Sequence, residues 1–331
     1  MPKDFTKALD YFTRAAQGND AAAQVILGGY YDKGVDLDPA DGKVEVAPNA
    51  AGALELYRLA ARNNVPLALY NVGVFYEEGR TLDQDPTKAF ANYLQAAGGG
   101  FAPAMQKVGV YYLNGAGTLK DPIAASGWFS RAAAAGLPEG LLSLGVMAES
   151  GMVPVGAEST PAKAASEAYT QVIKAPQVAE ATRFEALLRL GGLYFRGSLV
   201  AAGAAPTPDY ESAYRYFKQA SLLAPTNELA MATLKEAAAK LTPEQIKKLD
   251  AAAAETAAAQ PAASAPAPAT ATDAPASTRP APRAQPTEPG ASVTPPAETP
   301  AAMPAAAAAT TTPAATDPEK KPGFRLPLFG R

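Results

Sequence analysis

The sequence predicts an all-α fold, a solenoid of stacked helix–turn–helix repeats. Two patterns recur along the chain. The first is an apolar residue followed by Gly-x-x-Tyr-x-x-Gly, as in Val108 to Gly115; it occurs five times, with Ala148 replacing the tyrosine in one copy. The second is an alanine, an aromatic residue four positions later and usually two alanines three further on, as around Tyr93. Each pattern gathers small and apolar residues on one helix face. Each repeat is therefore a helix pair that needs its neighbours for stability.

The aromatic residues of the second pattern define the period. Their separations are 45, 36, 36, 40 and 48 residues, so that 36 is the basic repeat length. The aromatic residues are Phe12, Tyr57, Tyr93, Phe129, Tyr169 and Phe217. The extra length falls in three insertions, which we expect to project from one edge of the array. They are Val35 to Asn49, Met152 to Thr160 and Ser198 to Pro208.

Local signals predict where the helices begin, end and cross. A capping side chain before proline predicts helix starts at Asp85-Pro86, Asp121-Pro122 and Thr160-Pro161. A left-handed helix end is predicted at Gly18, Gly98, Gly136, Gly34, Gly79, Gly115, Gly151 and Gly197. Glycine inside a helix costs about 1 kcal/mol, so its recurrence there predicts close helix crossings. These internal glycines are Gly28, Gly73, Gly109, Gly145 and Gly191. Aromatic residues just before the anchors are predicted to pack between repeats: Tyr11, Trp128 and Tyr216.

The chain divides into four parts by composition. Residues 1–241 form the predicted solenoid, which ends in a polar capping helix from Glu228 to Lys240. Residues 242–259 begin with Thr-Pro-Glu-Gln, which predicts one more helix from Pro243 to about Ala258. Residues 260–318 are rich in Ala, Pro and Thr, a composition typical of disordered linkers. Residues 319–331 are basic and carry a candidate docking cluster for a partner, an anionic membrane surface or the chain's own groove. Its apolar members are Phe324, Leu326, Leu328 and Phe329.

Composition restricts the chemistry. The chain has no Cys and no His, which excludes disulfides, zinc sites built on these residues and histidine acid–base catalysis. Its net charge of −3 provides no basic field for nucleic acid. No phosphate-binding glycine motif occurs. The carboxylate pairs Glu77/Glu78 and Asp83/Asp85 fall at helix ends and in loops, where solvated charges are common. We therefore expect no enzyme, no cofactor and no metal site.

The N-terminal segment and the apolar runs bear on the cellular location. The first residues contain no apolar run of signal-peptide type, and no window approaches the length of a membrane span. A cytoplasmic protein is expected, or an envelope-associated or periplasmic one if the N-terminus has been processed.

The two patterns together resemble the Sel1-like repeat family, relatives of the tetratricopeptide repeat. The resemblance covers roughly residues 4 to 235 and implies a right-handed superhelix whose first helices line the concave surface. It also implies adaptor roles in bacterial complexes, often near the envelope. The polar residues just after each aromatic anchor would then form a row that binds a protein or peptide partner. The row consists of Arg14, Arg58, Gln95, Arg131, Gln171 and Gln219.

A peptidoglycan- or carbohydrate-directed enzyme, or its accessory, is the alternative. An ordered acidic cluster facing the groove would favour the enzyme, whereas a mixed-charge or apolar groove would favour the adaptor.

Overall fold

The computed structural model describes residues 5–35, 46–153, 155–156, 159–201 and 203–259. The predicted linker, the docking cluster and most of the first insertion lie outside these residues. The described chain consists of helices, with one isolated bridge between Val35 and Val46. The helices are α1 (Phe5–Gln17), α2 (Ala21–Lys33), α3 (Ala50–Arg62), α4 (Pro66–Glu78), α5 (Pro86–Gly98), α6 (Ala102–Asn114), α7 (Pro122–Ala134), α8 (Pro138–Glu149), α9 (Pro161–Lys174), α10 (Glu180–Phe195), α11 (Tyr210–Leu223), α12 (Glu228–Ala238) and α13 (Pro243–Ala259).

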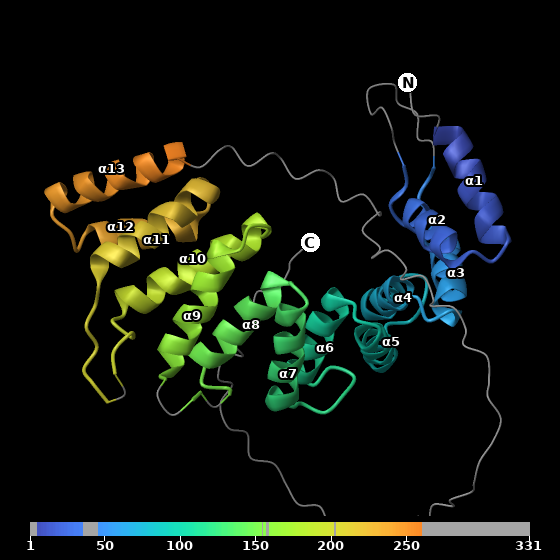
Figure 1. Cartoon of the computed structure of the whole chain (residues 1–331), viewed down its shortest axis with the longest axis horizontal. Helices are drawn as coiled ribbons and strands as arrows, with labels where there is room; N and C mark the ends of the chain where they lie inside the picture. Colours follow the sequence, from blue (N-terminus) through green and yellow to red (C-terminus); the bar gives the residue numbers. More distant parts are fainter. Residues whose placement is uncertain (1–4, 36–45, 154, 157–158, 202, 260–331) are drawn as a thin grey trace, which may run out of the picture. The chain divides into compact units, whose positions relative to one another are not determined.

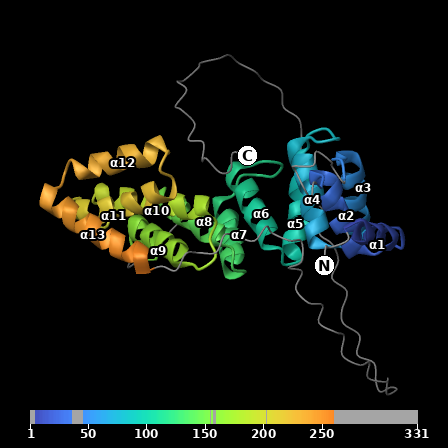
Figure 2. The same ribbon diagram turned by 90° about the horizontal axis from the view of Figure 1, so that it is seen from above.

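Successive helices pack against one another from α1 to α12 (Figures 1 and 2). Each helix therefore meets mainly the helix before it and the helix after it in the sequence. This serial packing is the arrangement that the repeat pattern predicts. Among the described residues, no helix combines the length and the apolar character that a membrane span requires.

The predicted helix starts are confirmed. The side chains of Asp85, Asp121 and Thr160 each accept a hydrogen bond from a backbone N–H in the first turn that follows, and a proline occupies that turn. Helices α4, α6 and α8 start differently, because they have a proline in the first turn but no side-chain cap. Helix starts are thus specified by local chemistry that the sequence displays.

The predicted helix ends are only partly correct. Gly136 and the five glycines that close the Gly-x-x-Tyr-x-x-Gly copies all have a positive φ. Gly18 and Gly98 do not, and their prediction was wrong: α5 includes Gly98, and the left-handed residues are Asn19 and Gly100. The chain continues in helical geometry past the first glycine because the last backbone N–H groups are still bonded within the helix, as Gly99 N–H is to the carbonyl oxygens of Gln95 and Ala96.

The internal glycines mark close helix crossings, as predicted. A Cβ atom on Gly109 of α6 would lie 2.5 Å from Cε1 of Phe129 in α7. The same contact, at 2.5 to 2.8 Å, recurs between Gly28 and Tyr57, Gly73 and Tyr93, Gly145 and Tyr169, and Gly191 and Phe217. Each glycine therefore makes room for the aromatic anchor of the next helix, which compensates for its poor helix propensity.

The three aromatic residues that directly precede an anchor differ in how far they are buried. Trp128 is half-buried and packs against the cluster that contains Tyr93 and Tyr111. Tyr216 is half-buried and stacks on Tyr194 with ring centroids 5.6 Å apart. Tyr11 was predicted to pack between repeats, but it is 62% exposed. The reason is positional, because α1 has no helix before it in the described part of the chain.

Candidate functional site

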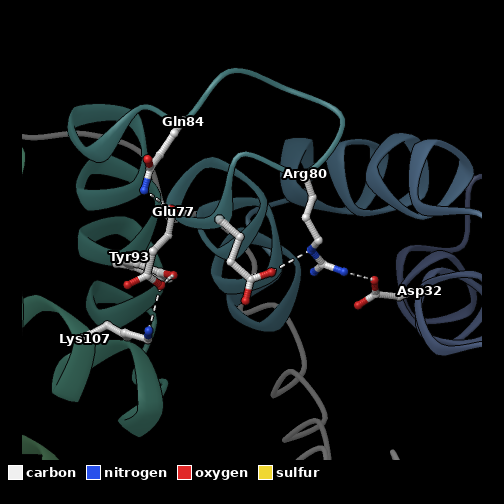
Figure 3. Close-up of polar contacts among 7 residues, drawn as sticks. Asp32, Glu77, Arg80, Gln84, Tyr93 and Lys107 are labelled. Carbon is white, nitrogen blue, oxygen red and sulfur yellow. Dashed lines mark hydrogen bonds and ion pairs between the residues drawn. The ribbon is translucent and has the colours of Figure 1, made fainter. Parts of the chain in front are cut away.

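Two hydrogen-bonded networks link successive helices of the array. At the junction of α4, α5 and α6, the Tyr93 hydroxyl donates to Glu77 Oε2 at 2.6 Å, and Lys107 Nζ donates to the same oxygen at 2.7 Å (Figure 3). Gln84 donates to the Glu77 backbone carbonyl at 2.8 Å. We call Glu77, Tyr93 and Lys107 the Glu77 network. It connects three successive helices through one carboxylate.

Burial affects the protonation of the Tyr93 hydroxyl in the Glu77 network. The Tyr93 ring is fully buried, and this burial, together with the neighbouring Glu77 carboxylate, raises the pKa of Tyr93 well above its ordinary value. The tyrosine therefore stays neutral and acts as a hydrogen-bond donor.

A second network has the same design. Tyr169 of α9 donates to Glu149 Oε2 at 2.7 Å, and Arg196 pairs with Glu149 Oε1 at 2.7 Å. Arg189 of α10 lies 3.6 Å from Glu149 and also pairs with Glu185 at 2.8 Å. Burial of the ring, together with Glu149, likewise raises the pKa of Tyr169.

The acid and the anchor are matched throughout the array. The residue four positions after each internal glycine is acidic where the facing anchor is tyrosine, and apolar where it is phenylalanine. The pairs are Asp32/Tyr57, Glu77/Tyr93, Glu149/Tyr169, Leu113/Phe129 and Phe195/Phe217. In the Glu77/Tyr93 and Glu149/Tyr169 pairs the acid accepts a hydrogen bond from the buried hydroxyl, whereas a buried phenyl ring needs no such partner. The sequence analysis did not find this rule, although the position four residues after each internal glycine can be read directly from the sequence.

The carboxylate pairs singled out in the sequence have structural partners. Glu77 belongs to its network. Glu78 pairs with Arg80 at 2.7 Å, and Arg80 also reaches Asp32 at 2.7 Å (Figure 3). Asp85 caps α5 and pairs with Lys88, and hydrogen bonds from Lys88 lower the pKa of that carboxyl group. Among the described residues, no group of three or more acidic side chains could hold a metal ion.

All six residues of the predicted polar row are exposed, one on each odd-numbered helix from α1 to α11. Arg14 pairs with Asp10 at 3.7 Å, and the guanidinium of Arg131 lies over the Trp128 ring. Gln95 donates to the Asn64 side chain at 2.7 Å. These contacts orient the side chains, while their exposure leaves them accessible to a partner.

Two surface hollows lie between helices. One, of about 540 Å³, is bounded by one face of α3 and by Thr81 and Leu82 of the loop between α4 and α5. Of the polar row, Arg58 lines this hollow, and it donates to the Tyr76 hydroxyl at 3.2 Å. The other, of about 510 Å³, lies between the start of α9 and the end of α10 and includes Glu149 and Arg196. The row thus contributes one residue to these two hollows.

Five segments match the sequence profile of the Sel1 repeat, and together they cover more than half of the chain. The segments are residues 1–20, 21–65, 66–101, 102–137 and 184–224. The chain belongs to the Sel1 repeat family. Sel1 repeats generally mediate protein–protein interaction. Residues 138–183 fall outside the match, yet α8 and α9 preserve the same crossing of Gly145 with Tyr169.

The family match also sets the phase of the repeat. The matched segments begin with the glycine helices α2, α4 and α6, and each ends after the helix that carries the aromatic anchor. The sequence analysis had paired the two patterns in the opposite order, with the aromatic helix first and the glycine helix second. The family phase agrees with the packing, because the glycine lets its helix approach the next one most closely. The polar row therefore lies on the second helix of each Sel1 repeat.

The chain is similar to solved structures of other repeat proteins. A Sel1 repeat protein of Oxalobacter formigenes is 25% identical, with a TM-score of 0.53 over 70% of this chain and 84% of that one. A protective antigen of uropathogenic Escherichia coli with an SLR fold is 17% identical, with a TM-score of 0.35 over 77% of this chain and 80% of that one. No curated protein matches the chain.

Proposed function

We propose that this protein is a non-enzymatic scaffold that binds partner proteins or peptides through the exposed side chains of its anchor helices. The observation that carries the proposal is the mixed-charge hollow beside α3, where Glu55 accompanies Arg58 and Arg62. An ordered acidic cluster there would have favoured an enzyme acting on a glycan. The carboxylates of Glu77 and Glu149 are instead engaged by tyrosine and basic side chains within the fold.

The family supports the class of function, and the polar row supplies candidate contacts. Exposed basic and amide side chains, presented once per repeat, suit an extended partner that crosses several helices. The basic members of the row are Arg14, Arg58 and Arg131, each on a different helix.

A capture experiment tests the proposal. The tagged full-length protein and a variant with Arg14, Arg58 and Arg131 changed to alanine are used to isolate partners from a lysate of the source organism. The variant is expected to lose specific partners while its melting temperature stays within a few degrees of the parent.

The matched control changes three other exposed basic residues to alanine, namely Lys163, Lys174 and Lys235. It removes the same charge from outside the row and should retain the partners. Equal partner recovery by both variants would show that the row does not bind. A third arm that deletes Phe324 to Arg331 asks whether the C-terminal cluster contributes, and unchanged capture would rule that contribution out.

A further inference from the structure

The C-terminal helix α13 shows how this array holds a helix on an anchor helix. Leu249 of α13 is buried and Ile246 is half-buried, both within the cluster around Phe217 of α11. Asp250 accepts a hydrogen bond from the Tyr214 hydroxyl at 3.0 Å and pairs with Lys218 at 3.0 Å. An aliphatic pair and a carboxylate therefore contribute to holding α13 on α11, together with a hydrogen bond from Gln245 to Glu211.

The face of α11 that α13 covers can be defined by its spacing from the anchor. Contacts with α13 involve the residues six and three positions before Phe217 and one position after it, namely Glu211, Tyr214 and Lys218. The corresponding residues of α3, counted from Tyr57, are Ala51, Leu54 and Arg58. All three line the hollow beside α3. On α3, Ala51 and Arg58 are exposed, whereas Leu54 is already buried within the repeat array.

Among the six anchor helices, α3 and α11 share one further feature. They alone combine an apolar or aromatic residue three positions before the anchor with a basic residue one position after it. The six pairs are Leu9/Thr13, Leu54/Arg58, Phe90/Leu94, Ser126/Ser130, Ser166/Thr170 and Tyr214/Lys218. Only α3 therefore repeats the pattern with which α11 receives both an aliphatic side chain and a carboxylate.

We propose that the hollow beside α3 binds a helix of a partner protein that carries two aliphatic residues one turn apart, followed directly by an acidic residue. The aliphatic pair would pack against Ala51, Leu59 and Leu82, the apolar lining residues that are not fully buried, and the carboxylate would pair with Arg58. This inference rests on the proposed scaffold function and specifies the chemistry of one partner. The Arg58 guanidinium has five N–H donors, so its present bond to Tyr76 leaves capacity for a carboxylate.

Charge favours this occupant over the chain's own C-terminal segment. Arg58 and Arg62 line the hollow against the single carboxylate of Glu55. An acidic helix complements this balance. Residues 319–331 carry four basic residues and a single acidic one, so they do not complement it.

The test uses a fluorescent peptide with the sequence of residues 242–259, which contains the required pattern, and the full-length protein. Fluorescence anisotropy is expected to show saturable binding, which is weak because an isolated helix of this length is only partly formed. Arg58→Glu should weaken binding at least about fivefold. Lys174→Glu, an exposed residue outside the hollow with the same change of charge, should leave binding unchanged.

The decisive comparison exchanges the charges of the peptide and the protein. A peptide with Asp250→Lys should bind the Arg58→Glu protein better than the unchanged peptide does. Binding that depends on Lys218 but not on Arg58 would mean that the peptide only displaces α13 from α11, and it would overturn the proposal. So would an absence of saturable binding to the parent protein.

Two further results would assign the hollow to a different occupant and so overturn the proposal. A peptide of residues 319–331 that binds in an Arg58-dependent manner would make it a site for the chain's own terminus. A dimer that forms at high concentration and is lost in Arg58→Glu would make it a site for α13 of a second copy. Failure of the peptide test leaves the scaffold function to the lysate experiment, so that the two failures can be told apart.

Discussion

The match between Tyr93 and Glu77 can be tested by replacing Tyr93 with Phe and Glu77 with Leu, the residue types found at the equivalent positions Phe129 and Leu113. Tyr93→Phe removes the 2.6 Å hydrogen bond but leaves Glu77 with Lys107. Because the Glu77 side chain is 30% exposed, the expected loss of unfolding free energy is at the lower end of the range for charged hydrogen bonds, about 1 to 2 kcal/mol.

Glu77→Leu should cost more than Tyr93→Phe. It leaves the hydroxyl of a fully buried Tyr93 without its acceptor and Lys107 without its counter-ion. The expected cost is about 2 to 3 kcal/mol. In the double variant the hydroxyl and the carboxylate disappear together, so its cost should fall short of the sum of the two single costs by about 1 kcal/mol or more.

Guanidinium unfolding followed by far-ultraviolet circular dichroism measures all four proteins of the cycle, and equal slopes are needed for a valid comparison. The reverse change is the matched control. Phe129→Tyr points a hydroxyl toward buried Leu113 and should destabilise by about 1 to 3 kcal/mol, and Leu113→Glu should restore part of that loss. Additive costs in the first cycle, with no rescue in the second, would refute the matching rule.

Three other predictions follow from the same structure. Gly109→Ala should lower the melting temperature, because the new Cβ would lie 2.5 Å from the fully buried Phe129 ring. Gly127→Ala is the control: a Cβ there would have no atom within 4 Å, so this variant should be neutral or stabilising by up to about 1 kcal/mol. Equal melting temperatures of the two variants would contradict this prediction. Alkaline solution should destabilise the protein. The fold raises the pKa of Tyr93 and Tyr169, so above about pH 10 only the unfolded chain loses these protons. For each of these tyrosines, the free energy of unfolding should fall by up to about 1.4 kcal/mol per pH unit. Equal free energies of unfolding from urea titrations below and above about pH 10 would refute this prediction. Chelator treatment should leave the circular dichroism and the melting temperature unchanged, and a reproducible drop would reveal a structural metal.

Much of the candidate surface could be predicted from the sequence, but its use could not. The spacing from each anchor correctly placed the six row residues on exposed positions. It could not show that Arg58 borders a hollow, because that hollow is closed by Thr81 and Leu82, which belong to the next repeat. Nor could it show that α13 covers the same face of α11, since α13 follows a helix that lacks the glycine pattern.

The sequence by itself determined the order of the helices, their starts and the crossings at the five internal glycines. These depend on residues within one turn, or on a spacing that recurs regularly, and both are visible in one dimension. The tertiary structure decided which side chains share a carboxylate. Tyr93 and Glu77 are 16 positions apart, and Lys107 and Glu77 are 30 apart. Whether such groups meet depends on how three successive helices pack, and no local propensity encodes that distance.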